Sequence, residues 1–264
     1  MIKIGKLKIG LKNKPIIIAE MSANHNQSLS RALKIVKAAA ASGAHMLKLQ
    51  TYTADTMTLN LNKGDFIIKD KNLWTGHSLY NLYRKAYTPW EWHKPIMKKA
   101  KELGMVCFSS AFDETSVEFL EKLNVPAYKI ASFEITDLPL IKKVAETGKP
   151  IIISTGLATL NEIREAVSII KKTGCKKYIL LKCTSSYPAP TDELNLLTLS
   201  DLRNKFNCEV GFSDHSLGIG AALTSVSFGA SIIEKHFTLD KNMKGPDHKA
   251  SIEPKELHHL VSSI

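Results

Sequence analysis

Two histidines end short apolar runs in the second half of the chain. The segment GFSDHSLG (211–218) carries His215 and SIIEKHF (231–237) carries His236, each near an acidic residue. Their separation of 21 residues excludes one helix face, where neighbours are three or four residues apart. A lone histidine at a strand end is more often a hydrogen-bonded structural residue, but two on neighbouring strands indicate a divalent metal. We therefore predict a catalytic metal site, with positions left open for water or substrate.

Lysine interrupts three other apolar runs, at Lys48, Lys129 and Lys182. Burying an unpaired ammonium group costs several kcal/mol, so a lysine that points into a protein interior needs an anion. That anion could be an internal carboxylate, or it could be the phosphate or carboxylate of a ligand cradled by serine hydroxyls. Three lysines near one site favour the ligand. The internal carboxylates that could pair with them are Glu20, Glu134 and Glu234.

These residues belong to eight short runs rich in isoleucine, valine and leucine, separated by amphipathic segments. The runs lack strict alternation, as parallel strands covered on both faces do. Eight strand–helix units in about 250 residues predict an α/β fold of the (β/α)8 TIM-barrel class. An open doubly wound sheet is the alternative, but no GxGxxG follows the first run. The predicted strands are 16–20, 45–50, 105–110, 127–132, 150–155, 178–185, 209–214 and 231–237.

In such a barrel, chemistry lies at the carboxyl ends of the strands. Seven of the eight runs end in polar side chains beyond simple turn formers. Lys48 and Gln50 are two residues apart, as are Glu234 and His236, so each pair lies on one side of its strand. The fifth run ends in Ser-Thr-Gly (154–156), which could simply start the next helix.

Helix boundaries have signals of their own. Thr159 and Glu162 form a predicted capping box, and Thr88 and Glu91 form another, with Pro89 at the first helical position. Left-handed helix ends are predicted at Gly43, Gly104, Gly148, Gly174, Gly229 and Asn124.

Two segments depart from the strand–helix pattern within a predicted single catalytic domain, residues 1–264. Residues 1–14 indicate a short hairpin or lid before the first strand. Residues 52–87 are too long for a plain loop, and a long insertion after a strand is often functional.

The composition, 44% hydrophobic and 23% charged, is that of an ordinary globular protein. No apolar run is long enough for a membrane span, and the first residues lack the features of a signal peptide. The four cysteines have no metal-like spacing, and three adjoin apolar runs, which predicts buried structural thiols in a reducing cytoplasm. The net charge of +11 favours anionic ligands. Because the lysines of the helical segments are scattered, we predict neither a nucleic-acid nor a membrane partner.

An ordered set of motifs resembles the N-acetylneuraminic acid synthase family. The motifs, from Ile16 to His248, are IIIAEMSANHN, MLKLQTY, CFSSAF, PAYKIASFE, PIIISTG, KCTSSYP, GFSDHSLG, EKHFTLD and GPDH. Within the family, TYTADTMTLN, DFIIKD followed by LW, and TPWEWH look most like the branch that makes pseudaminic acid.

The resemblance implies a role for each matching residue. His215 and His236 match the metal-binding positions, usually described with Mn2+, while Mg2+ or Co2+ is possible. Positions that hold phosphoenolpyruvate are matched by Lys48, Lys129, Ser110, Ser132, Ser185 and Ser213. Positions that contact the sugar, the metal-bound water or the reacting centre are matched by Glu20, Gln50, Glu134, Tyr187 and Asp247. Lys182 stands where some sialic acid synthases have histidine, and its role stays open.

The implied reaction condenses phosphoenolpyruvate with an amino-sugar aldehyde, here 2,4-diacetamido-2,4,6-trideoxy-L-altrose, to give pseudaminic acid and phosphate. Carbon C3 of phosphoenolpyruvate attacks the aldehyde, water adds at C2, and phosphate leaves by C–O cleavage. Glu134 is the candidate for handling a proton of that water or of a sugar hydroxyl. The alternatives are a sialic or legionaminic acid product, another phosphoenolpyruvate-condensing barrel, and an inactive barrel that binds anions.

One departure from the family pattern concerns the end of the chain. Family members continue into a small domain resembling antifreeze proteins, which reaches across a homodimer and lends an arginine to the partner's sugar site. This chain stops at Ile264, inside the last predicted helix. We expect that domain to be absent here and the full-length protein to form a homodimer.

Overall fold

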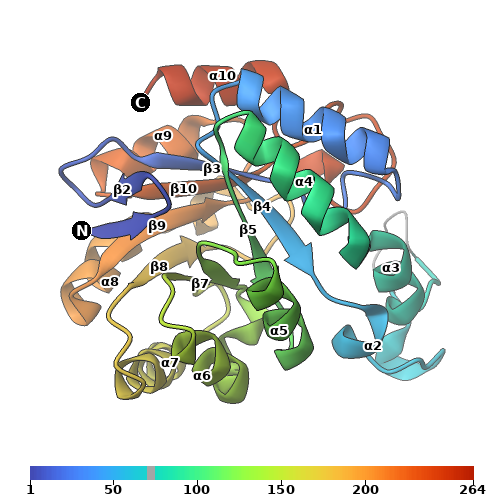
Figure 1. Ribbon diagram of the computed structural model, residues 1–264, viewed down its shortest axis with the longest axis horizontal. Coiled ribbons are helices and arrows are strands. Elements are labelled where there is room, and N and C mark those ends of the chain that lie inside the picture. Colours follow the sequence, from blue (N-terminus) through green and yellow to red (C-terminus); the bar gives the residue numbers. More distant parts are fainter. Residues whose placement is uncertain (70–74) are drawn as a thin grey trace.

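The computed structural model describes residues 1–69 and 75–264. Within them, eight parallel strands close into a barrel in the order β10-β3-β4-β5-β6-β7-β8-β9, which confirms the predicted TIM barrel. Figure 1 shows the strands running from the end that carries the N-terminus towards the end that carries α2 and α3. The barrel strands are β3 (Ile16–Glu20), β4 (Met46–Thr51), β5 (Val106–Ala111), β6 (Tyr128–Ile130), β7 (Ile151–Ser154), β8 (Tyr178–Cys183), β9 (Glu209–Asp214) and β10 (Ile232–His236).

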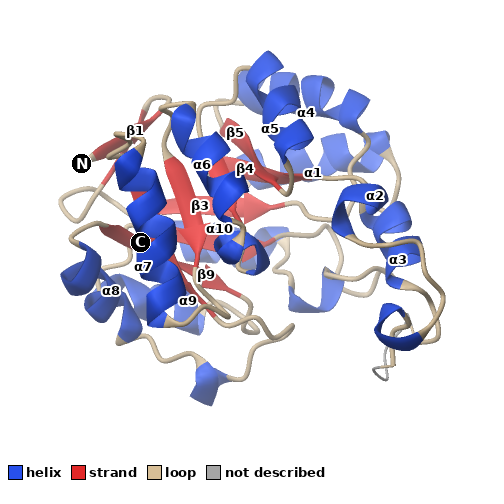
Figure 2. Ribbon diagram, turned by 90° about the horizontal axis from the view of Figure 1, so that it is seen from below, coloured by secondary structure: helices blue, strands red, loops and turns tan. Residues whose placement is uncertain are grey.

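A layer of helices covers the outside of the barrel (Figure 2). Each helix turns an apolar stripe inward: α7, for example, buries Ile163, Ala166, Val167 and Ile170 at steps of three, one and three residues. In the described part of the chain, no helix is long and apolar enough to cross a membrane. The covering helices are α1 (Leu29–Ala41), α4 (Trp90–Glu102), α5 (Glu114–Lys122), α6 (Leu138–Glu146), α7 (Leu160–Lys172), α8 (Thr198–Phe206), α9 (Gly220–Ser227) and α10 (Pro254–Ser262).

The strands face two separate apolar cores, because successive side chains point to opposite sides of a sheet. One core lies between barrel and helices, and a smaller one fills the barrel. Beyond the last residue that a strand contributes to the inner core, the next inward side chain is polar or a thiol. On six strands the change from apolar to polar is Ile18 to Glu20, Met46 to Lys48, Phe108 to Ser110, Ile152 to Ser154, Leu181 to Cys183, and Ile232 to Glu234. The interior of the barrel is therefore apolar at its N-terminal end and polar at its C-terminal end.

The local helix signals were only partly right. The box of Thr159 and Glu162 forms at the start of α7, as predicted. The box predicted at Thr88 is wrong: α4 begins at Trp90 after Pro89, with no side-chain cap. Instead, the Thr88 hydroxyl hydrogen-bonds His25 Nε2 at 3.1 Å. The hydrogen bond to the distant His25 thus replaces the helix cap that the sequence predicted for Thr88.

Two further segments lie at opposite ends of the barrel (Figure 1). At the N-terminal end, β1 (Ile2–Ile4) and β2 (Leu7–Ile9) pair in antiparallel fashion, and their isoleucines join the inner core. At the other end, the segment 52–87 contains α2 (Ala54–Met57), the 3-10 helix η1 (Gly64–Phe66) and α3 (Leu79–Ala86). Residues 70–74, with the last residue of DFIIKD and the LW pair, lie outside the described residues.

Gly211 is required by close packing between strands. A Cβ atom there would lie 2.4 Å from the carbonyl oxygen of Ile232 and 2.7 Å from Leu181 Cδ2. We expect Gly211→Ala to lower the free energy of unfolding by about 1–3 kcal/mol, measured by urea denaturation. Gly220→Ala, where nothing lies within 4 Å, is the matched control and should be neutral or slightly stabilising. Equal effects at both positions would contradict the packing argument.

Candidate active site

The centre of the polar end is one buried carboxylate, Glu234 of β10. Its Oε1 lies 2.6 Å from Lys48 Nζ and 3.0 Å from Lys129 Nζ, and it accepts a hydrogen bond of 3.2 Å from Ser213 Oγ. Lys48 Nζ also lies 3.1 Å from Glu20 Oε2. All five side chains are buried. Both lysines therefore meet internal carboxylates, one of the two partners that their sequence pattern allowed.

The pKa values of this cluster are set by burial and by the charges of its neighbours. Burial by itself would raise the pKa of Glu234, but the ammonium groups of Lys129 and Lys48 hold that pKa well below its usual range. For Glu20 burial is the largest influence, and it raises the pKa to about 7 despite the nearby Lys48. Glu20 is thus partly protonated near pH 7. Burial also lowers the pKa of Lys129, against the attraction of Glu234. Two buried lysines thus share two buried carboxylates, and the protonation of Glu20 decides how far their charges cancel.

Hydroxyl groups converge on Gly156, just beyond β7. A Cβ atom on Gly156 would lie 2.4 Å from Ser185 Oγ and 2.9 Å from Ser132 Oγ, so only glycine leaves this space open. The Gly156 N–H donates to Ser132 Oγ at 3.2 Å. Within the described residues, the buried hydroxyls of Ser154 and Ser185 have no hydrogen-bond partner. Unpaired donors around an open space fit the oxygens of an anion.

The two histidines come together on neighbouring strands. The ring centroids of His215 and His236 are 5.4 Å apart, and Tyr187 stacks on His215 at 4.0 Å. His215 Nδ1 lies 2.8 Å from the Thr184 carbonyl oxygen, so it carries the hydrogen and leaves Nε2 as the basic nitrogen. His236 Nδ1 is buried and has no partner within residues 1–69 and 75–264. Burial lowers the pKa of His236 to about 3, which keeps the ring neutral, as metal binding requires.

These donors fit a divalent cation held by two histidines. No group of three histidine, cysteine or acidic side chains that could enclose a metal exists among the residues the structure describes. A closed structural site is therefore not formed by these residues alone. Two imidazoles with open positions leave room for a substrate or water ligand.

Asp247 lies in the loop after β10 and is joined to the first barrel strand. Its carboxylate accepts a hydrogen bond from Ser22 Oγ, and the Ser22 N–H donates to Glu20 Oε1 at 2.9 Å. His248 secures the same loop, because its ring contacts Thr238 Oγ1 at 2.7 Å and Asn26 Oδ1 at 3.3 Å. The loop that carries Asp247 is therefore held in place from both sides.

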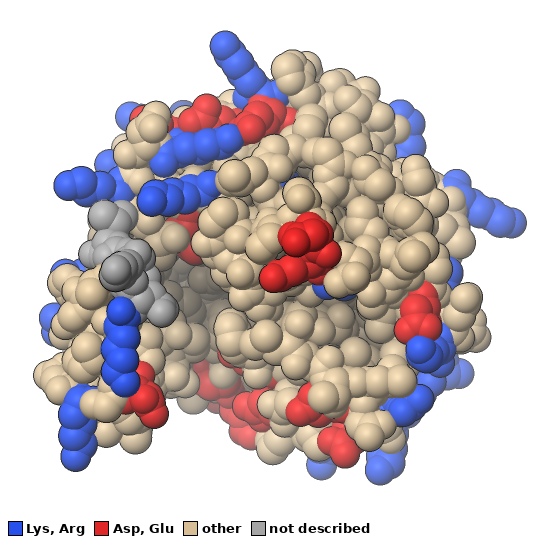
Figure 3. Space-filling view, turned by 180° about the vertical axis from the view of Figure 1, so that it is seen from behind, with Lys and Arg blue, Asp and Glu red and all other residues tan. Residues whose placement is uncertain are grey.

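The remaining predicted residues also lie at this end of the barrel. Gln50 and Lys129 flank Ser110 as its ladder partners on β4 and β6. Glu134 lies just beyond β6, in the 3-10 helix η2 (Phe133–Thr136). Its buried Oε2 has no hydrogen-bond partner in the described structure. Burial raises the pKa of Glu134 to about 7. The space-filling view in Figure 3 shows the molecule hollowed between the 52–87 segment and the barrel body.

The expectation that three lysines share one site is wrong, and strand parity is the reason. Lys182 follows the inward Leu181, so it points away from the interior and donates to the Cys183 carbonyl and to Thr184 Oγ1. Only Lys48 and Lys129 join the Glu234 cluster, whereas Lys182 lines a cavity with Gly156 and Ser185. Asp214 likewise turns away from the histidines and forms a fully buried ion pair of 2.7 Å with Lys235.

Sequence reasoning also missed residues that the structure places in the site. Cys183, predicted as a structural thiol, lies inside the barrel with Sγ 3.8 Å from His215 Nδ1. Burial is the largest influence and raises the pKa of this thiol, but His215, Ser132 and Lys129 together outweigh burial and lower the pKa to about 7. Gly156 and Ser154 were considered only as a helix start. His25, in the loop after β3, is buried and hydrogen-bonds Thr88 Oγ1.

Fold and site together define an α/β-barrel with a cluster of charged and hydroxyl side chains at the carboxyl ends of its strands. Residues 35–264 match the NeuB family, and the chain belongs to this family. It is 47% identical over 251 residues to pseudaminic acid synthase of Campylobacter jejuni, covering 95% of this chain and 73% of that protein. It is 42% identical over 254 residues to N,N'-diacetyllegionaminic acid synthase of the same organism, covering 95% and 75%.

A solved structure has the same architecture. The N-acetylneuraminic acid synthetase of Leptospira borgpetersenii, in complex with citrate, matches with a TM-score of 0.90 and 34% identity, over 99% of this chain and 86% of that one. The family resemblance inferred from the ordered motifs is confirmed.

The buried cluster predicts a large cost for removing Glu234. Glu234→Gln leaves two buried ammonium groups with one partly protonated carboxylate, and we expect the free energy of unfolding to fall by about 3–5 kcal/mol. Glu118→Gln is the control, because its ion pair with Lys143 is half exposed and should contribute at most about 1 kcal/mol. Urea denaturation of both variants measures the difference. Similar losses would show that the cluster does not depend on this carboxylate.

Proposed function

We propose that this chain is a phosphoenolpyruvate-dependent nonulosonic acid synthase that makes pseudaminic acid. The reaction joins phosphoenolpyruvate to an N-acetylated amino-sugar aldehyde, 2,4-diacetamido-2,4,6-trideoxy-L-altrose, and releases phosphate. The observation that carries the proposal is the pair of buried lysines, Lys48 and Lys129, at the same end of the barrel as the buried, unpaired hydroxyls of Ser154 and Ser185. Such a pocket suits a ligand with both a phosphate and a carboxylate.

Phosphoenolpyruvate would lie across the pocket with its two anionic groups apart. One group of donors is buried inside the barrel and consists of Lys48, Lys129, Ser110 and Ser213. The other group, Ser132 and Ser185, borders the space at Gly156. Because these groups come from separate strands of a rigid barrel, they are in position before the ligand arrives. Fixed donors of this kind orient a reactant without reorganisation during the reaction.

His215 and His236 would hold the divalent cation, for which Mn2+ is our choice and Mg2+ or Co2+ the alternatives. When bound, such a cation supplies Lewis acidity to the sugar's carbonyl group. The chain itself keeps His236 neutral by burial, and it orients His215 through the Thr184 carbonyl and the stacked ring of Tyr187.

Proton transfer falls to carboxyl groups with raised pKa values. Glu134 has an unpaired buried oxygen and a pKa of about 7, which suits a base that must accept and return a proton near neutral pH. Glu20, Gln50, Tyr187 and Asp247 would contact the hydroxyl and acetamido groups of the sugar. The similarity to pseudaminic acid synthase at 47% identity, against 42% for the legionaminic acid enzyme, supports the choice of sugar.

The first test is phosphate release from phosphoenolpyruvate by the natural gene product with added Mn2+. Two sugars are compared, the diacetamido-trideoxy-altrose and N-acetylmannosamine. We expect release with the first sugar only, and none after chelation of the metal. Release with the second sugar would keep the reaction and overturn the choice of sugar. Binding of phosphoenolpyruvate without release with any amino sugar would favour an inactive anion-binding barrel.

The pKa of Glu134 predicts a specific pH dependence. A base works only when ionised, so kcat should rise as the pH passes through about 7 and level off above it. Glu134→Gln should lower kcat by about 100-fold or more and remove this rise. The exposed Glu118→Gln should keep both the rate and the profile. A rise that persists in Glu134→Gln would move the assignment to Glu20, whose pKa is also about 7.

A further inference from the structure

The first fourteen residues contain five lysines and no acidic residue. They fold into the β1–β2 hairpin and the loop that leads to β3, at the end of the barrel opposite the site (Figure 1). All five lysine side chains are exposed there. The net charge of +11 is therefore not spread evenly, and a compact part of it lies on this hairpin. The lysines are Lys3, Lys6, Lys8, Lys12 and Lys14.

The hairpin has one apolar and one cationic face. Ile2, Ile4 and Ile9 pack into the inner core of the barrel. Lys3 and Lys8 are direct partners in the antiparallel ladder and both are exposed. Like charges directly opposite each other destabilise a strand pair. An arrangement that the fold itself does not need points to an external anion.

The neighbouring carboxylate does not neutralise these lysines. Glu209 lies next to Gly10, but its carboxylate is engaged by Arg203 at 3.1 Å and by Ser231 at 3.1 Å. Within the described residues, none of the five hairpin lysines has a carboxylate within ion-pair distance. Their charge is available to a partner.

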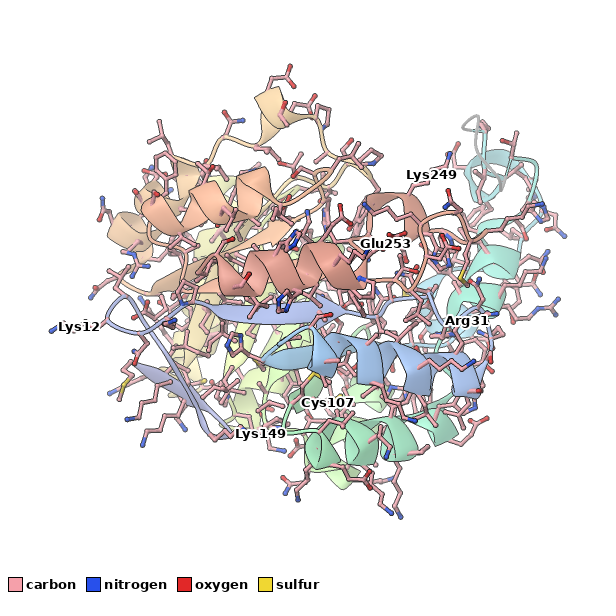
Figure 4. All side chains as sticks on the ribbon, turned by 90° about the horizontal axis from the view of Figure 1, so that it is seen from above. Lys12, Arg31, Cys107, Lys149, Lys249 and Glu253 are labelled. Atoms are coloured by element: carbon pink, nitrogen blue, oxygen red, sulfur yellow. The ribbon has the colours of Figure 1, made fainter. Side chains whose placement is uncertain are left out.

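Exposed leucines stand among the lysines. Leu11 is 60% exposed in the loop after β2, and Leu103 is 43% exposed at the end of α4. Lys6 Nζ lies 3.7 Å from the position of a Cβ on Gly104, which places it beside Leu103. Lys12 extends from the end of the molecule opposite Arg31 and Lys249 (Figure 4). We call the five lysines with Leu11 and Leu103 the hairpin face.

We infer that the hairpin face docks the enzyme on an anionic lipid bilayer, which departs from the sequence-based prediction that the chain has no membrane partner. Lysines next to a bilayer are attracted by its negative surface potential, and aliphatic side chains between them enter the headgroup region. A nucleic acid would use the lysines but leave the leucines without a role, and the hairpin strands carry no aromatic side chain on which bases could stack. The bilayer is thus the partner that accounts for both kinds of residue.

Docking by this end would leave the site accessible. In a barrel of parallel strands, the hairpin closes the amino ends while the lysine–carboxylate cluster lies at the carboxyl ends. Substrates would reach the pocket from the solvent, on the side away from the membrane. The inference does not rest on the proposed reaction, since it concerns the other end of the molecule.

Vesicle co-sedimentation tests the inference. The full chain is mixed with vesicles of phosphatidylcholine, or of phosphatidylcholine with an equal amount of phosphatidylglycerol, at low salt. We expect binding only to the anionic vesicles, weakened by high salt. Lys3→Glu/Lys8→Glu should reduce the partition coefficient by at least about 25-fold, from about fivefold per lysine. Leu11→Ser should reduce the part of the binding that survives high salt.

The matched control reverses the same number of charges elsewhere. Lys249→Glu/Lys255→Glu changes two exposed lysines away from the hairpin and should bind nearly as well as the parent chain. Circular dichroism verifies that every variant is folded. Absence of binding to anionic vesicles, or equal loss in both double variants, would overturn the inference. Displacement of the vesicles by duplex DNA at equal phosphate concentration would overturn it in favour of a nucleic acid.

Discussion

The ion pairs of Glu234 are the interaction on which the rest of the site depends. Two ammonium groups cannot stay inside a barrel without counter-charge, because taking an ion out of water costs several kcal/mol. By accepting from Lys48, Lys129 and Ser213, one carboxylate of β10 joins side chains of β4, β6 and β9. The contacts that allow the lysines to be buried also fix where their charges stand. A site for an anionic reactant needs such preorganised charge.

Some polar groups in and around this cluster lack a full set of partners. Full neutralisation would give the most stable empty barrel, but it would leave nothing to attract an anion. Glu20, with a pKa near 7, and the unpaired hydroxyls around Gly156 keep polar groups unsatisfied at one end of an otherwise well-packed interior. Local departures from good packing and pairing are expected where a protein binds its ligand. On six strands, the position at which the inward side chains change from apolar to polar marks the boundary between the packed core and the binding region.

Sequence reasoning identified all eight barrel strands, because short apolar runs alternate with strong helix signals. It could not assign the face of each strand, since runs covered on both sides lack the alternation that reveals parity. Lys48 and Lys182 interrupt their runs in the same way, yet one points into the barrel and the other away from it. Asp214 and His215 are adjacent and therefore face opposite sides. Gly156 was missed because its contribution is empty space, which has no signature in a single sequence.

Local motifs gave reliable answers only where no distant side chain competed. The capping box at Thr159 forms on an exposed helix start, whereas Thr88 is buried and bonds to His25 from another loop. The hairpin is the opposite case, because the function of its lysines can be inferred only from where the fold places them. Five lysines in fourteen residues are unremarkable in a flexible tail. Once isoleucines anchor the hairpin to the inner core, the lysines must share one side of it, and mutual repulsion cannot be relieved by moving apart. Because the barrel separates its two ends, this charge can serve a partner without disturbing the charge balance around Glu234.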